Sequence, residues 1–97
     1  MEELHFEWDA KKSRSNEVKH GVAFDEARTA FFDDYARIIE DSVGSDGEQR
    51  LVLLGLSVRF RVLVVCHCYR ESDCVIRIIS ARKADPSERL EYSRNLP

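Results

Sequence analysis

Two arginines lie within the most apolar segment of the chain and are its first candidates for chemistry. Arg77 and Arg82 belong to the segment 74–82, whose other members are mostly Ile, Val and Ala. An arginine in such a strand must find a partner or face a groove, because burying an unpaired charge costs several kcal/mol. A guanidinium can bind a phosphate with two parallel hydrogen bonds. We therefore take both as phosphate-binding candidates, with structural ion pairs to acidic residues as the alternative.

His67 is the candidate for proton transfer, because histidine is the side chain that titrates near neutral pH. If residues 71–73 form a three-residue turn, Arg70 pairs with Cys74 and His67 lies opposite Arg77. A guanidinium at that position would lower the pKa of the imidazole and favour a neutral base. The alternative is a core histidine that is hydrogen-bonded to the backbone.

Five further side chains are candidates for substrate contacts. Lys12 and Lys19 lie seven residues apart, on one face of the first expected helix, and can meet a nucleic-acid backbone, an acidic protein or only water. Arg59 and Arg61 flank an expected hairpin tip and could follow a phosphate backbone. Tyr69 could stack on a base, although a packed aromatic is the plainer interpretation.

The three cysteines, Cys66, Cys68 and Cys74, raise the question of a metal site. Strand alternation puts His67 on the opposite face from Cys66 and Cys68, and no second ligand pair follows at zinc-finger spacing. An odd number of cysteines without a secretory signal favours reduced thiols. The sequence therefore predicts buried thiols and neither a metal nor another cofactor.

Length and composition favour one globular domain over residues 1–97, since 43% of the residues are apolar. The longest apolar run, Val62 to Cys66, is far shorter than the roughly 20 residues that span a membrane. No signal segment is visible at the start, so we expect a cytoplasmic protein. The net charge of −3 does not suggest nucleic acid, but residues 59–97 carry 8 Lys and Arg against 5 Asp and Glu.

The order of expected elements predicts an α+β domain, with an antiparallel sheet of four to five strands packed by two N-terminal helices and one C-terminal helix. Asp9 and Gly21 are placed to begin and end the first helix, and Asp85 to cap the last one before Pro86. A loop is expected at 42–47. Strands are expected at 4–8, 36–40, 49–56, 61–70 and 74–82, and the first two helices at 9–20 and 25–33.

Alternation along the last two strands predicts which residues share a face of the sheet. We expect a core face with Val62, Val64, Cys66, Cys68, Ile76 and Ile78. The opposite face would form the floor of a groove, with Leu63, Val65, His67, Tyr69, Val75, Arg77 and Ile79. Arg77 and Arg82 are five residues apart, so they can share a phosphate only if a bulge turns Arg82 back. Otherwise we expect Arg82 to bind the last helix, at Glu88.

Taken together, these residues resemble the BrnT family of bacterial toxins, part of the broader RelE-like group of small ribonucleases. The similarity runs from Phe6 to about Tyr92. It rests on Phe6-Glu7-Trp8-Asp9, Lys12, Asn16, Lys19-His20-Gly21-Val22, Phe24, Glu26-Ala27, Glu48, Arg50, Gly55, Leu63-Val64-Val65, His67, the run from Ile76 to Arg82, Glu88-Arg89 and Tyr92. The chain departs from the family pattern at three places. Ala10 stands where the family usually has Pro, and the turn 58–61 lacks the usual Gly. Asp85-Pro86 replaces a more typical polar or basic pair.

The resemblance implies a RelE-like fold and a metal-independent endoribonuclease that cleaves RNA in the cytoplasm and inhibits translation. In that role Arg77 and Arg82 would hold the scissile phosphate and His67 would transfer a proton. The implied partner is a BrnA-type antitoxin, and operator DNA would be bound only through the toxin–antitoxin complex. The toxin would form a homodimer, or a heterotetramer with the antitoxin. The alternatives are a non-catalytic protein-binding domain and a degenerate toxin that acts only through antitoxin and operator.

Overall fold

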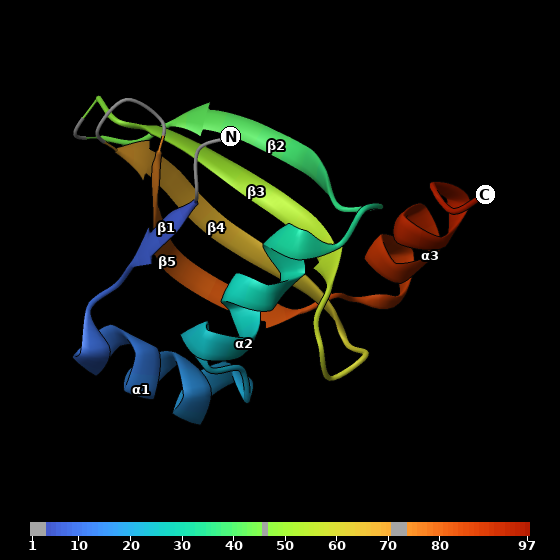
Figure 1. Ribbon diagram of the computed structural model, residues 1–97, viewed down its shortest axis with the longest axis horizontal. Coiled ribbons are helices and arrows are strands. Elements are labelled where there is room, and N and C mark those ends of the chain that lie inside the picture. Colours follow the sequence, from blue (N-terminus) through green and yellow to red (C-terminus); the bar gives the residue numbers. More distant parts are fainter. Residues whose placement is uncertain (1–3, 46, 71–73) are drawn as a thin grey trace.

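Five strands form one sheet in the order β1-β5-β4-β3-β2 in the computed structural model, which describes residues 4–45, 47–70 and 74–97 (Figure 1). The elements in chain order are β1 (His5–Glu7), α1 (Ala10–His20), α2 (Phe24–Thr29), the short 3-10 helix η1 (Ala30–Phe32), β2 (Arg37–Val43), β3 (Gln49–Leu56), β4 (Val62–Arg70), β5 (Val75–Lys83) and α3 (Pro86–Arg94). Strands β2 to β5 are antiparallel neighbours, whereas β1 runs parallel to β5. The predicted α+β class is confirmed, with a mixed rather than wholly antiparallel sheet.

Local signals place the two ends of α1 and the start of α3 where the sequence predicts them. The carboxylate of Asp9 accepts hydrogen bonds from the first backbone N–H groups of α1, and Gly21 ends that helix in the left-handed conformation, at φ 73°. Asp85 and Glu88 form a reciprocal capping box at the start of α3. The second expected helix is divided, because α2 ends at Thr29 and continues as η1.

Two boundaries differ from the expectation. Ser42 and Val43 belong to β2 rather than to the loop, because they pair with Arg50 and Gln49 of β3. The expected turn at 71–73 lies outside the described residues.

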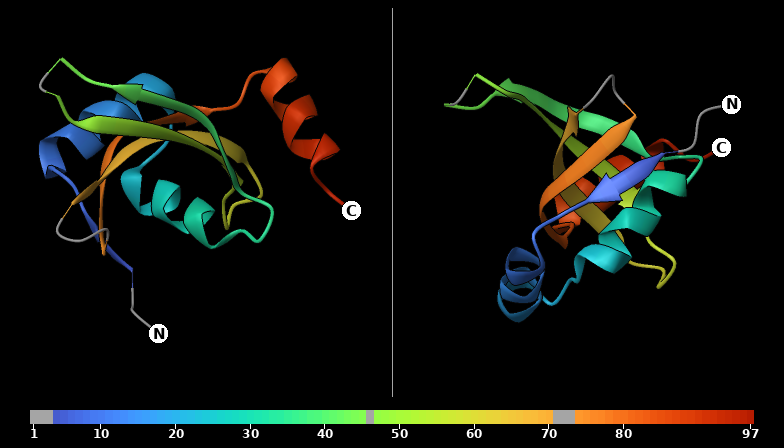
Figure 2. Two further views of the ribbon diagram at one scale, coloured as in Figure 1. Left: turned by 90° about the horizontal axis from the view of Figure 1, so that it is seen from above. Right: turned by 60° about the vertical axis from the view of Figure 1, so that its left-hand side comes forward.

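The main core lies between the α2 segment and one face of the sheet. It joins Val22, Phe24, Ala27 and Ala30 to Leu53, Leu63, Val65, Ile78 and Ala81. A smaller cluster on the other face joins α3 to the sheet through Leu54, Val64, Ala84 and Tyr92. Helices α2 and α3 therefore lie on opposite sides of the sheet (Figure 2). Only one end of the second face is covered by α3, and we call the remainder the open face.

The pairing of β4 with β5 differs by one residue from the prediction. Arg70 pairs with Val75, and His67 with Ile78, so the expected pairing of His67 with Arg77 is wrong. The register then shifts, and Cys66 pairs with Ser80, which leaves Ile79 as an extra residue in β5. This bulge reverses the alternation of the strand, because two residues there oppose one.

The register and the bulge together change the predicted faces. Ile78 and Ala81 both pack into the α2 core, so Arg77 and Arg82 both project from the opposite, open face. His67 and Arg77 are consequently on different faces. The division of β4 into two sets was right, but the set with Leu63, Val65 and His67 forms the core, and the set with Val64, Cys66 and Cys68 faces the open side.

No helix among the described residues has the length and apolar character needed to cross a membrane.

Candidate active site

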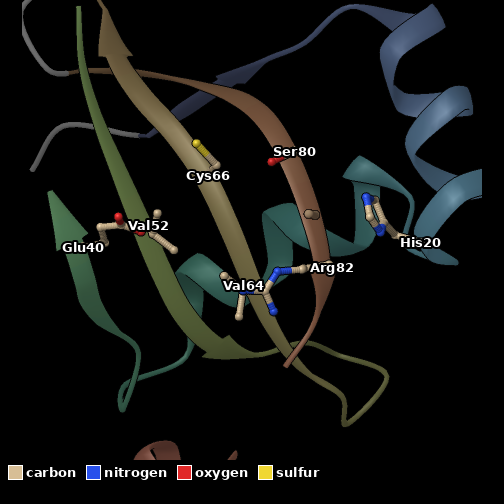
Figure 3. A pocket seen from close by; sticks show the side chains of 8 residues that line it. His20, Glu40, Val52, Val64, Cys66, Ser80 and Arg82 are labelled. Carbon is tan, nitrogen blue, oxygen red and sulfur yellow. The ribbon is translucent and has the colours of Figure 1, made fainter. Parts of the chain in front are cut away.

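A pocket of about 170 Å³ lies on the open face (Figure 3). Its polar lining comes from four elements: His20 at the end of α1, Glu40 on β2, Cys66 on β4, and Ser80 and Arg82 on β5. Figure 3 shows His20 and Glu40 on opposite sides, with the side chain of Arg82 extending between them over Val64. Val52 and Ala81 complete the lining. The pocket thus combines a cation, an imidazole and a carboxylate.

Two bulges deliver the charged residues to this pocket. In β2, Ile38 pairs with Leu53 and Glu40 with Val52, which leaves Ile39 as an extra residue and turns Glu40 to the open face. In β5, the bulge at Ile79 does the same for Arg82. Regular strands would have turned both side chains toward the opposite, α2-covered face. Bulges commonly re-aim side chains next to active sites.

Asn16 holds α1 against β5 and so positions His20. The side-chain amide of Asn16 donates to the backbone oxygens of Val22 and Ala81, at 2.8 Å each, and its oxygen accepts from the backbone N–H of Ala81 at 3.1 Å. Among the described residues β1 pairs with residues 75–77, and the amide of Asn16 satisfies the edge of β5 beyond the end of β1. His20 lies four residues further on the same face of the helix and is half-buried at the rim of the pocket.

Arg82 forms a two-point ion pair with α3. Its guanidinium donates to both carboxylate oxygens of Glu88, at 2.7 and 2.9 Å. Hydrogen bonding to Glu88 raises the pKa of Arg82, and the same contact is the main reason that the pKa of Glu88 is lowered. The side chain of Arg82 remains 44% exposed and is accessible to a ligand. Both expectations for Arg82 therefore meet here, since a bulge turns it to the open face and Glu88 binds it.

Arg77 lies at the other end of the open face. Its Nη1 is 3.5 Å from a carboxylate oxygen of Glu7 on β1, which also contacts Arg70. At about 3.3 Å per residue, Arg77 and Arg82 are roughly 15 Å apart along the strand. Because each is bound at its own end of β5, the two do not hold one phosphate together in this arrangement.

His67 is fully buried in the core. Its ring meets Phe31 edge-on, with centroids 4.7 Å apart, and lies beside Tyr69. Its Nδ1 donates to the backbone oxygen of Val65 at 3.1 Å, and its Nε2 has no hydrogen-bond partner among the described residues. Burial lowers the pKa of His67, which keeps the imidazole neutral. The histidine predicted to transfer protons is thus out of contact with solvent and with the pocket.

The other predicted contact residues separate into two groups. Arg61 donates from Nε to Glu26 at 2.9 Å, makes a second contact with the same carboxylate through Nη2, and donates to the backbone oxygen of Gly21 at 3.0 Å. It joins the β3–β4 hairpin to α2. Arg59, Lys12, Lys19 and Tyr69 are exposed.

The cysteines of the open face are neutral thiols at physiological pH. Burial raises the pKa of Cys66, and it is also the main reason that the pKa of Cys68 is raised to about 11. A thiol that stays protonated is a poor nucleophile. The described residues contain no group of three or more His, Cys, Asp and Glu that is arranged to hold a metal ion.

Glu40, Ser80 and His20 are not among the site residues that the sequence predicts. Glu40 and Ser80 each lie just after a bulge, and nothing in the apolar pattern indicates where an extra residue enters a strand. For His20 a signal was available, because an asparagine, Asn16, lies one turn earlier in the predicted helix. Asparagine is unfavourable within a helix and often has a specific partner there.

The fold is that of a solved ribonuclease toxin. The crystal structure of the Brucella abortus toxin BrnT matches 88% of this chain and 99% of its own, with a TM-score of 0.61 at 21% sequence identity. The family model of BrnT, the ribonuclease toxin of type II toxin–antitoxin systems, matches residues 8–88. The chain therefore belongs to the BrnT family. No curated protein matches it.

Proposed function

We propose that this protein cleaves RNA in the cytoplasm as the toxin of a type II toxin–antitoxin pair, and that the pocket of the open face is the cleavage site. Membership of the BrnT family supports the activity. The observation that carries the choice of site is the meeting of Arg82, His20 and Glu40 at one accessible pocket. Loss of RNA in this way would inhibit translation.

These three side chains match the requirements of cleavage without a metal. The 2′-hydroxyl must lose a proton, the phosphate must be stabilised as charge develops, and the leaving 5′-oxygen must gain a proton. Arg82 binds the phosphate, Glu40 accepts the proton and His20 donates one. Glu40 and His20 lie on opposite sides of the pocket. This arrangement suits in-line cleavage, in which the 2′-oxygen attacks on one side of phosphorus and the 5′-oxygen leaves on the other.

Substrate binding at Arg82 has to compete with Glu88. The carboxylate of Glu88 is planar and a phosphate is tetrahedral, but each presents two oxygens that a guanidinium can bind with two hydrogen bonds. A phosphate diester therefore replaces the carboxylate, and Glu88 keeps its other contact, the backbone N–H of Asp85 at 2.9 Å. Arg77 and the exposed Lys12, Lys19 and Arg59 are then proposed contacts for flanking phosphates, whereas the buried His67 and the paired Arg61 are left out of the substrate surface.

The test is cleavage of RNA by purified variants whose folding is checked by thermal unfolding. His20→Asn, Glu40→Gln and Arg82→Lys should each lower the rate by about a hundredfold or more, the usual effect of losing an acid–base or charge-stabilising group. His5→Asn and Asp41→Asn are matched controls, since both wild-type residues are exposed outside the pocket. Chelation with EDTA should leave the wild-type rate unchanged.

Unchanged rates in all three pocket variants would refute the site. Intact RNA with the wild-type protein would refute the enzyme and leave a binding domain or a degenerate toxin.

The proposed partner is a BrnA-type antitoxin, supported by the type II class of the family. It neutralises the toxin and carries the complex to operator DNA. Co-expression should restore growth and yield a stable complex, whose mass distinguishes a simple pair from a heterotetramer. The mass of the toxin alone tests for a homodimer.

A further inference from the structure

The tip of the β3–β4 hairpin exposes a phenylalanine in an unfavourable backbone conformation. Phe60 has φ 60°, in the left-handed region that favours glycine, and 85% of its surface is exposed. A large apolar residue there gains little from the core and carries backbone strain. Such strain persists where the surrounding structure imposes it, and it often marks a ligand contact.

The tip is rigidly held rather than loose. Within the turn, the N–H of Ser57 donates to the backbone oxygen of Arg61, and the N–H of Phe60 donates to the backbone oxygen of Ser57, at 2.9 Å each. The N–H of Val58 donates to the hydroxyl of Thr29 at 3.0 Å, and that of Arg59 to the hydroxyl of Ser57 at 3.2 Å. All four consecutive N–H groups are therefore satisfied.

The turn is also fastened to the helical layer. Ser57 donates through its hydroxyl to Glu26 at 2.7 Å, and Arg61 binds the same carboxylate. Phe60 is thus presented on a fixed support, which lowers the entropy lost on binding.

The chemistry beside the ring favours an anionic partner with a flat apolar face. Arg59 has a side chain that is 70% exposed, and its nearest carboxylate oxygen, on Glu26, is 3.9 Å away. An aromatic ring next to an exposed cation is the usual platform for unpaired bases of single-stranded nucleic acid. Phe60 precedes Val64 by four residues, and Val64 pairs with Arg82 of the pocket. Four residues of chain span at most about 14 Å, so the tip lies within that distance of Val64 in the pocket lining.

We propose that Phe60 stacks on an unpaired base of single-stranded RNA and that Arg59 binds the adjacent phosphate. The inference rests on the proposed ribonuclease function. The ring anchors the strand a few nucleotides from the cleaved bond, so the protein selects unpaired RNA over duplex.

Stacking can be measured directly with Phe60→Trp. The chain has one tryptophan of its own, Trp8, which packs edge-on against Phe24, so a second indole at the tip is a separable fluorescence reporter. The probe is a short single-stranded 2′-O-methyl RNA, which lacks the nucleophile for cleavage. We expect its binding to quench the new fluorescence and a blunt-ended duplex of the same sequence to leave it unchanged.

Affinity provides the second measurement. By fluorescence anisotropy, Phe60→Leu should bind the labelled probe about tenfold more weakly than wild type, which corresponds to about 1.4 kcal/mol. Val58→Ala, in the same turn and with 68% of the wild-type residue exposed, should bind as wild type does. Thermal unfolding is the check that each variant is folded.

Fluorescence of the Phe60→Trp variant that stays unquenched at saturating probe, or equal affinities of Phe60→Leu and wild type, would overturn the inference. Quenching by a co-purified antitoxin but not by RNA would overturn it in favour of a protein partner. Cleavage of unmodified RNA by wild type is measured separately. Normal cleavage with unchanged binding by Phe60→Leu therefore sinks the anchor alone, whereas quenching without any cleavage sinks the proposed enzyme alone.

Discussion

Replacing Arg61 distinguishes a structural ion pair from a contact with RNA. The sequence suggested that Arg61 follows a phosphate backbone, whereas the structure binds its guanidinium to Glu26 and to the backbone oxygen of Gly21. The side chain of Glu26 is only 6% exposed, and that of Arg61 is 25% exposed. We therefore predict that Arg61→Ala lowers the free energy of unfolding and does not directly weaken RNA binding.

The size of the loss follows from the partners that remain. Removing one member of a buried ion pair typically costs about 3–5 kcal/mol, because the other charge is left buried. Glu26 keeps the hydroxyl of Ser57, and water can enter the space left by the partly exposed Arg61. We expect a loss of about 2–4 kcal/mol. Arg59 is exposed and lies 3.9 Å from the same carboxylate, so Arg59→Ala should lower the free energy of unfolding by no more than about 0.5 kcal/mol.

The assay is urea unfolding at two pH values. The hydrogen bond from Arg61 is the main reason that the pKa of Glu26 lies below its usual value. The pair therefore stabilises the fold fully above the unfolded pKa of about 4.3, and this contribution is lost as pH falls through the lower folded pKa. The difference between wild type and Arg61→Ala should be largest near neutral pH and should shrink toward about pH 3.

A double-mutant cycle with Glu26→Gln completes the experiment. The double variant should lose clearly less than the sum of the two single losses, because both remove the same interaction. If Arg61→Ala loses less than about 1 kcal/mol at neutral pH, the reasoning from burial is refuted. Weaker RNA binding at unchanged stability would restore Arg61 to the substrate surface.

Three further predictions concern the layers around the site. Gly55→Ala should lose about 1–3 kcal/mol in urea unfolding, because a Cβ there would lie 2.8 Å from the backbone oxygen of Ala30; stability equal to wild type would show that η1 moves freely away. His67→Leu should keep the rate of RNA cleavage and change stability by less than about 1.5 kcal/mol; a folded but inactive variant would return His67 to the catalytic group. Tyr92→Phe should lower the free energy of unfolding by about 1.5–3 kcal/mol, because the hydroxyl of Tyr92 donates to the carboxylate of Asp33 at 2.6 Å. Burial is the main cause of the raised pKa of Tyr92, and this hydrogen bond is the second cause. An unchanged unfolding midpoint would contradict the prediction.

Membership of the BrnT family could be recognised from the sequence because its signals are spread along the chain and each is local. Asp9 and Gly21 bound α1 as predicted, and β3 begins and ends at the predicted residues. Helix caps and turns depend on side chains within a few positions of one another, so the order of residues is sufficient to specify them. The same applies to Asp85, which caps α3.

The position of the candidate site was less predictable, because it depends on which face of the sheet is covered. Alternation separated Val65 and His67 from Val64 and Cys66 correctly, but it does not tell which set lies under a helix. Phe24 and Ala27 of α2 pack on the set that contains Val65, and this contact makes His67 a core residue. A helix can cover a sheet from either side, and only its packing decides between them.

The sequence by itself determined the α+β elements, the ends of α1, the start of α3, the family and the presence of two arginines on the last strand. Only the tertiary structure decided which of those side chains share a surface. The bulges at Ile39 and Ile79 turn Glu40 and Arg82 to the open face, and one extra residue in a strand reverses the direction of every side chain that follows. The register that accommodates such a residue is set by contacts between distant segments, as when Asn16 of α1 binds the backbone of Ala81, 65 positions later. Local patterns contain no record of these contacts.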